Sequence, residues 1–190
     1  MARDLLTQRD VGKAMQIPHN LIHRRRHAAF SMIELMIVLA IAAILTVIAV
    51  PNFKQTIDRQ KITTASSDLY AAIGLSRAEA IRRGTQVDLD AISGNWENGW
   101  SISVPSSSGP AERVYTHVSV PTTVKVDAPV FGTALSYDGT GRARLASDSQ
   151  VVLSGFWTFT ISNNPAYTRK VKINAVGRPQ LCNPSVDPSC

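Results

Sequence analysis

Residues suited to metal binding or to proton transfer near neutral pH are scarce in this chain. Its 190 residues include only two cysteines and four histidines. Three of the histidines precede residue 30, so residues 30–190 contain His117 alone. That count excludes a histidine cluster for metal binding or general-base catalysis. Two cysteines are also fewer ligands than a zinc site requires, so we expect no metal and no other cofactor.

Local catalytic motifs are missing as well. The sequence has no Gly-x-Ser-x-Gly elbow, no glycine-rich phosphate loop and no internal repeat. Trp96 and Trp100 stand beside a glycine turn, where aromatic residues commonly pack, so we expect them in a core rather than in a ligand platform. His117 lies in a short apolar strand and is expected to be structural or exposed. We therefore do not expect an enzyme.

Charge is nearly absent from one long stretch. The sixteen residues from Leu35 to Val50 include nothing more polar than Thr46, and the run counted from Phe30 has 21 residues. That length suits a helix that crosses a bilayer. Glu34 lies near one edge of the run, where a carboxylate is costly unless it meets a positive partner. The sequence thus predicts a transmembrane helix over 30–50, with Glu34 as a candidate functional residue.

Positive charge precedes this run directly. Arg24, Arg25 and Arg26 stand just before it, and such residues stay in the cytoplasm. We therefore expect a single-pass protein with a cytoplasmic N-terminus, whose C-terminal domain lies outside the inner membrane, in the periplasm if the cell has two membranes.

The leader, the junction after Ala29, Glu34 as the fifth residue beyond it, and Pro51 at the end of the run resemble the type IV pilin class. The resemblance implies that a prepilin peptidase cuts between Ala29 and Phe30 and methylates the new amine of Phe30. One difference is that the residue before the cut is normally glycine. The resemblance also implies that Phe30, Glu34 and Pro51 serve assembly, with Glu34 neutralised by the methylated amine of an adjacent subunit.

The partners implied are other major and minor pilins or pseudopilins, the prepilin peptidase, an inner-membrane assembly platform and the lipid bilayer. Two other interpretations stay open. An ordinary secretory signal would be cut near Ala49 and release a soluble protein, although its apolar core is usually shorter and lacks a carboxylate. An uncleaved membrane anchor is the other.

Helical periodicity continues beyond the apolar run. Residues recur at spacings of three and four, which is typical of an amphipathic helix: Ile62, Ala65, Leu69, Ala72, Ile73, Ser76 and Ala80. We expect this helix to continue from the membrane segment to about Arg83 and to end at Gly84, which suits a left-handed cap. Pro51 should kink it.

From Gln86 onward the sequence favours strands separated by turns. Candidate strands cover 86–92, 100–104, 114–118, 122–126, 135–137, 142–145, 151–161 and 167–174. We predict an α+β fold in which the long N-terminal helix packs on a C-terminal antiparallel β-sheet domain. The predicted parts are a cleaved leader at 1–29, a transmembrane helix at 30–50, an amphipathic helix at 51–84, a β domain at 85–180 and a disulfide-closed tail at 181–190.

Three segments carry a narrower resemblance. Residues 95–100 (Asn-Trp-Glu-Asn-Gly-Trp), residues 76–80 (Ser-Arg-Ala-Glu-Ala) and residues 174–179 (Asn-Ala-Val-Gly-Arg-Pro) are similar to the GspH/FimT group of minor pilins and pseudopilins. This resemblance implies a minor subunit that helps to initiate or cap a type IV pilus, or the equivalent pseudopilin of a type II secretion system. A DNA receptor in natural transformation is a third interpretation.

The DNA interpretation depends on charge near the C-terminus. The leader carries four of the six net positive charges of the chain, so residues 30–190 keep only +2. From residue 142 onward, however, six basic residues oppose two acidic ones. Arg169, Lys170, Lys172 and Arg178 are the candidate DNA-binding residues, because phosphates attract such clusters. The FimT-type Gly-Arg-x-Arg tail is incomplete, since Gln180 stands in place of the second arginine, and a basic strand edge that prevents unwanted pairing is the competing interpretation.

Cys182 and Cys190 lie eight residues apart in a proline-rich segment. In an oxidising compartment they should form one disulfide that orders the tail more than it stabilises the fold.

Overall fold

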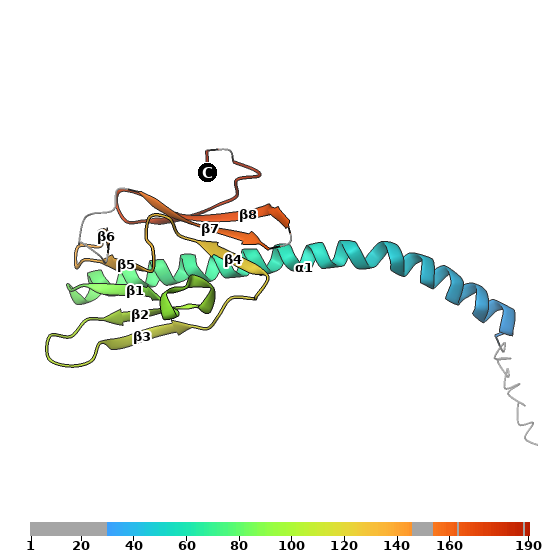
Figure 1. Ribbon diagram of the computed structural model, residues 1–190, viewed down its shortest axis with the longest axis horizontal. Coiled ribbons are helices and arrows are strands. Elements are labelled where there is room, and N and C mark those ends of the chain that lie inside the picture. Colours follow the sequence, from blue (N-terminus) through green and yellow to red (C-terminus); the bar gives the residue numbers. More distant parts are fainter. Residues whose placement is uncertain (1–29, 146–153, 163, 188) are drawn as a thin grey trace, which may run out of the picture. The chain divides into compact units, whose positions relative to one another are not determined.

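The computed structural model describes residues 30–145, 154–162, 164–187 and 189–190 (Figure 1). The predicted leader, including Ala29, lies outside the described residues. The chain divides into two compact units, residues 1–44 and residues 45–190. All elements of the β domain belong to the second unit.

One helix, α1 (Met32–Arg83), contains both predicted helical segments. Ser31 caps its start, because its hydroxyl oxygen accepts a hydrogen bond from the Glu34 amide at 3.2 Å. The helix ends at Gly84, which has a φ of 66° and donates its amide to the Ala80 carbonyl. The predicted end is therefore confirmed. The helix continues through Pro51, and the kink expected there stays a prediction.

The strands form two antiparallel sheets. The five-stranded sheet has the order β3-β2-β1-β5-β6, and the four-stranded sheet has the order β4-β7-β8-β9. The first comprises β1 (Val87–Ala91), β2 (Trp100–Val104), β3 (Glu112–His117), β5 (Ala134–Tyr137) and β6 (Ala143–Leu145). The second comprises β4 (Val124–Asp127), β7 (Gly155–Ile161), β8 (Asn164–Ile173) and β9 (Pro179–Cys182). Two short 3-10 helices, η1 (Ile92–Gly94) and η2 (Trp96–Asn98), connect β1 to β2.

The eight predicted strands correspond to β1–β8, with ends shifted by up to three residues at most boundaries. Residues 151–153 of the seventh predicted strand lie outside the described residues. The sequence did not predict β9, and the boundary placed at residue 181 falls inside it. The tail is therefore partly a sheet edge, because Pro179–Cys182 pairs with Lys170–Ile173.

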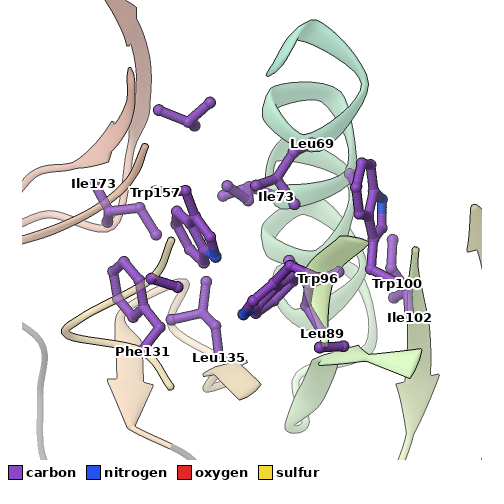
Figure 2. Close-up of a cluster of buried hydrophobic side chains, with 14 of the residues drawn as sticks. Leu69, Ile73, Leu89, Trp96, Trp100, Ile102, Phe131, Leu135, Trp157 and Ile173 are labelled. Atoms are coloured by element: carbon purple, nitrogen blue, oxygen red, sulfur yellow. The ribbon is translucent and has the colours of Figure 1, made fainter. Parts of the chain in front are cut away.

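A single hydrophobic core joins α1 to both sheets. All seven residues of the predicted amphipathic face are buried, and Leu69 and Ile73 are completely so. Figure 2 shows Leu69 and Ile73 between Trp157 of the four-stranded sheet and Trp100 of the five-stranded sheet. Burying one stripe of the helix against the inner faces of two sheets satisfies the apolar periodicity of both kinds of element. The predicted α+β fold is confirmed.

Candidate functional site

Two of the predicted assembly residues lie at the start of α1, Phe30 just before the helix and Glu34 in its first turn. Phe30 is 74% exposed, and the Glu34 side chain is exposed as well. Among the described residues, no cation forms an ion pair with this carboxylate. Glu34 therefore has the exposure that a contact with another chain would require.

Exposed apolar side chains continue along the helix beyond Glu34. Ile37, Leu39, Ile41, Ile44, Leu45, Val47 and Phe53 are all more than half exposed. Within the described part of the chain, no helix reaches the length and apolar content of a membrane span. The backbone of Pro51 lies within α1.

Side chains of residues 95–100, between β1 and β2, contact residues of the four-stranded sheet. The Trp96 indole donates a hydrogen bond to the Gly132 carbonyl at 2.6 Å, and its ring contacts Trp157 edge-on at 5.4 Å between centroids. Glu97 reaches β4, where its carboxylate accepts a hydrogen bond from Lys125 at 2.8 Å. The expectation that Trp96 packs in a core is confirmed, because it is 3% exposed.

Trp100 and His117 form a stacked pair on the edge of the five-stranded sheet. Their ring centroids lie 4.1 Å apart and their planes differ by 7°. His117 Nε2 lies 3.2 Å from the Asp68 carboxylate of α1. The structural role expected for His117 fits this geometry, since the ring ties β3 to the helix.

The other two segments that carry the narrower resemblance, residues 76–80 and 174–179, lie against each other near the C-terminal end of α1. Arg77 donates hydrogen bonds to the carbonyls of Gly141, at 3.0 Å, and Val176, at 3.4 Å. The Tyr137 hydroxyl donates to the Gly177 carbonyl at 2.8 Å, and burial raises the pKa of Tyr137. Gly177 is buried with a φ of 75°, a conformation that favours glycine. These motif residues hold the β8–β9 turn against the helix, so their position gives them a structural role.

Ion pairs fasten the last turn of α1 to β3. Arg83 contacts both Glu79 and Glu112, and Arg82 contacts Glu79 at 2.6 Å. Hydrogen bonds from Arg82 and Arg83 lower the pKa of Glu79 to about 2. These groups belong to a structural network on the surface.

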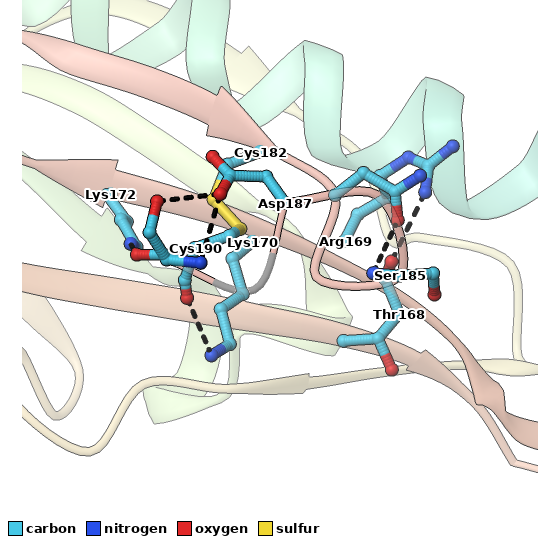
Figure 3. The surroundings of a disulfide bond; sticks show 10 residues. Thr168, Arg169, Lys170, Lys172, Cys182, Ser185, Asp187 and Cys190 are labelled. Carbon is cyan, nitrogen blue, oxygen red and sulfur yellow. Dashed lines mark hydrogen bonds between the residues drawn. A yellow bond between two sulfur atoms is a disulfide. The ribbon is translucent and has the colours of Figure 1, made fainter.

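The structure separates the four candidate DNA-binding residues. Lys170 and Lys172 project from the outer face of β8, because the intervening Val171 is buried. Arg169 lies on the opposite face, where it lines a small cavity with Arg59 and Ile62 of α1. Figure 3 shows its side chain apart from those of Lys170 and Lys172. Arg178 lies exposed in the turn before β9. The sequence therefore grouped residues that do not share one surface.

Cys182 and Cys190 form the expected disulfide, with Cα atoms 5.8 Å apart. The loop that they close folds over β8. Lys172 donates a hydrogen bond to the Ser189 carbonyl at 2.8 Å, and Lys170 donates to the Cys190 carbonyl at 3.3 Å. Sequence reasoning missed these contacts, although the strict alternation of lysine with valine and isoleucine in β8 places both lysines on one face.

Among residues 30–145, 154–162, 164–187 and 189–190, no group of three or more His, Cys, Asp or Glu side chains is placed to hold a metal ion.

Known protein families match both the N-terminal segment and the β domain of this chain. A family model described as type II transport protein GspH matches residues 65–177, and one described as a prokaryotic N-terminal methylation motif matches residues 24–50. The type IV major alpha-pilin of Moraxella bovis is 28% identical over 149 residues, which are 78% of this chain and 94% of that pilin.

Two solved structures share the fold. The type IV minor pilin FimU of Pseudomonas aeruginosa superposes with a TM-score of 0.56 at 21% identity, covering 67% of this chain and 92% of FimU. The minor pseudopilin EpsH of the Vibrio cholerae type 2 secretion system gives 0.50 at 11% identity, covering 65% of this chain and 98% of EpsH.

A long N-terminal helix packed on antiparallel sheets, with a methylation motif that extends over the start of the helix, places this chain in the type IV pilin-like class. Because the GspH model matches more than half of the residues, this chain belongs to the GspH family. The predicted GspH/FimT relationship is confirmed.

Proposed function

We propose that this chain is a minor type IV pilin that takes part in the assembly or priming of a pilus. The observation that carries the proposal is the match to a pilus subunit over 94% of that subunit's length, starting from a chain with an N-terminal methylation motif. The fold shared with the minor pilin FimU supports it. The proposed location is the bacterial inner membrane, from which the processed subunit enters the fibre.

The mechanism that we propose depends on the exposed first half of α1. Residues 30–50 insert in the bilayer and then pack into a bundle of neighbouring helices, because apolar side chains along this segment, such as Ile37, Leu39 and Ile44, are more than half exposed. Glu34 meets the methylated amine of Phe30 on an adjacent subunit. A buried carboxylate is tolerated when it is paired in this way, and the pair would fix the axial register of the incoming subunit.

A GspH-like minor pseudopilin of a type II secretion system is the alternative. The match to the GspH family model and the fold shared with EpsH support it. The same helix chemistry would serve either fibre. Deleting the gene and measuring twitching motility against secretion of a periplasmic substrate distinguishes them, since a pilin affects the first and a pseudopilin the second.

A DNA receptor for natural transformation has weaker support. Arg178 is exposed, but Lys170 and Lys172 already bond to the loop that the disulfide closes, and Arg169 faces α1.

The assembly role is tested by Glu34→Ala and Glu34→Gln in the full chain. Both should abolish incorporation into the fibre while leaving membrane insertion and the folded domain unchanged, because the apolar run of residues 35–50 is kept and every core residue belongs to the second unit. Immunoblotting of sheared fibres and of membranes measures incorporation and insertion. Thr46→Ala is the matched control, since it removes a polar group from the same apolar run without changing charge.

Normal fibre formation and normal incorporation of both Glu34 variants would overturn this role. A loss shared by Thr46→Ala would instead assign the defect to the helix in general.

A further inference from the structure

Two arginines from different elements share one small cavity without a carboxylate to neutralise them. Arg59 of α1 and Arg169 of β8 both line this cavity. The strands β7, β8 and β9 contain no Asp or Glu, and the carboxylate next to Arg59, Asp58, pairs with Lys61 at 3.2 Å. Within the described residues, neither arginine forms an ion pair. Their charges therefore favour an anion from outside the chain.

Tyr167 of β8 holds Arg59 in a defined position. The Arg59 guanidinium donates a hydrogen bond to the Tyr167 hydroxyl at 2.8 Å, and its central carbon lies 4.5 Å from the centroid of the ring. The same hydroxyl donates to the side-chain oxygen of Gln55 at 3.3 Å. Because the tyrosine ring packs against the hydrophobic core, the guanidinium is oriented before any ligand binds.

The cavity has room for a single ligand oxygen. Its volume is about 20 Å³, which suits one atom of the size of a water oxygen. Arg169 is partly buried there, and one N–H of its guanidinium donates to the Thr168 carbonyl at 3.3 Å. An oxygen of a phosphate group can enter beside both arginines while the rest of the group stays outside. The planar fork of N–H donors in arginine matches phosphate oxygens.

The site lies just beyond the apolar run of α1. Arg59 stands about 14 Å beyond Val50 along the helix axis. Helical side chains point back toward the N-terminus, so the long Arg59 side chain extends toward the bilayer in which we place residues 30–50. A lipid headgroup layer is about 5–8 Å thick, so the guanidinium can reach its outer boundary. The Tyr167 contacts bring the start of β8 to the same level (Figure 1).

We propose that Arg59 and Arg169 bind the phosphate of an anionic membrane phospholipid, such as phosphatidylglycerol, while the subunit is still in the bilayer. The inference rests on the proposed insertion of residues 30–50. A zwitterionic lipid fits less well, because two cations repel the ammonium of its headgroup and β7, β8 and β9 supply no carboxylate to bind it. The bound lipid fixes the depth of the β domain at the membrane surface before the subunit enters the fibre.

The test uses the full chain in a mild detergent, titrated with phosphatidylglycerol or with phosphatidylcholine. Native mass spectrometry counts the lipids that stay bound and gives a dissociation constant for each lipid. The leader contributes cations of its own, so the comparison is made between variants that all keep it. Tryptophan fluorescence checks that each variant is folded.

Replacing the two arginines should remove the preference for the anionic lipid. Arg59→Gln/Arg169→Gln should weaken binding of phosphatidylglycerol by about 10–30-fold, because each cation near an anionic lipid contributes a factor of about five. Binding of phosphatidylcholine should not change. Arg59→Gln alone changes an exposed side chain and should weaken binding by about fivefold, even if the change at Arg169 disturbs β8.

Two further variants separate this site from net charge. Arg59→Lys/Arg169→Lys keeps both charges and should restore most of the affinity. Arg113→Gln/Arg178→Gln is the matched control, since it removes two exposed arginines on β3 and in the turn before β9. It should leave the affinity for phosphatidylglycerol unchanged.

Unchanged binding of phosphatidylglycerol by both glutamine variants would overturn the proposal, and so would an equal loss in the control. Titration calorimetry with inorganic phosphate is a second arm. Free phosphate that binds as tightly as the lipid would overturn the assignment to a membrane lipid.

Flotation on phosphatidylcholine vesicles measures membrane insertion separately. A chain that floats but shows no preference between the lipids overturns the lipid site alone. A chain that does not float overturns the proposed membrane location and the lipid site together. The Glu34 variants keep both arginines, so the assembly role is tested independently.

Discussion

Gly99 stands where the backbone of β3 leaves no room for a side chain. Its φ is 99°, and a Cβ atom there would lie 2.8 Å from the carbonyl carbon of Val118 and still closer to the His117 oxygen. Both the conformation and the contact require glycine. We expect Gly99→Ala to lower the free energy of unfolding by about 3 kcal/mol, from backbone strain and overpacking together.

Gly74→Ala is the matched control for this prediction. Gly74 lies within α1, and nothing surrounds the position of its missing Cβ within 4 Å. The alanine should raise stability by about 0.5–1 kcal/mol, because glycine is a poor residue for a helix interior. Urea unfolding followed by tryptophan fluorescence measures both. Equal effects of the two substitutions would contradict the role given to Gly99.

Asp138 organises the turn between β5 and β6. Burial raises its pKa, but hydrogen bonds from Thr140, Arg142 and Arg144 outweigh that effect and hold the pKa at about 2, against an ordinary value of 3.8. A carboxyl whose pKa is lowered by folding stabilises the fold when the pH is above its pKa in the unfolded chain. That contribution is lost as the pH falls to its pKa in the folded protein. Asp138→Asn should therefore cost about 1 kcal/mol at neutral pH, and the difference from the unmodified chain should vanish between about pH 4 and pH 2. Unfolding curves across that range decide it, and a difference that does not depend on pH would contradict the prediction.

The sequence shows which residues are charged, but not which face of the sheet each charged side chain occupies. Arg169 and Lys170 are neighbours in sequence, yet consecutive strand residues point to opposite faces. Strand alternation was the signal that separates them. The contacts of the lysines with Ser189 and Cys190 depend on the path of the chain after β9, which local composition does not determine.

At the scale of elements, α1 was the most predictable part. Seven buried positions follow from a repeat of three and four residues, and Gly84 marks the end by its conformational freedom. In contrast, β9 was missed. Its four residues, Pro179–Cys182, begin with a proline and alternate weakly, and they become a strand because β8 offers a free edge. Two sheets rather than one also depend on long-range pairing, such as that of β1 with β5.

The burial of a single face of α1 predicts a large difference between two leucines. Leu69 is fully buried between the sheets, whereas Leu75 is 38% exposed on the same helix. Leu69→Ala should lower the free energy of unfolding by about 3 kcal/mol, through lost burial and a residual cavity. Leu75→Ala should cost less than about 1 kcal/mol. Thermal or urea unfolding measures both, and similar losses would show that the helix is not held by this face.

At the scale of the whole molecule, charge and apolar surface are unevenly distributed along the chain. The sequence pI near 9.7 arises mostly in residues 1–29, since residues 30–190 carry only +2. The apolar half of α1 is exposed, while every residue of the core belongs to the second unit. A chain divided in this way suits a subunit whose first unit is completed by other chains and whose second unit folds around its own core.

Processing should remove the leader, residues 1–29, by a cut between Ala29 and Phe30. We expect the product to begin with an N-methylated Phe30 and to stay in the membrane fraction, because the apolar residues after the cut remain attached. Intact-mass analysis of membranes measures both the cut and the methyl group. Ala29→Gly is the control, since it restores the residue usual at this junction and should be processed at least as completely. A soluble periplasmic product that begins near Val50 would instead establish an ordinary secretory signal, and an unprocessed chain in the membrane would establish a permanent anchor.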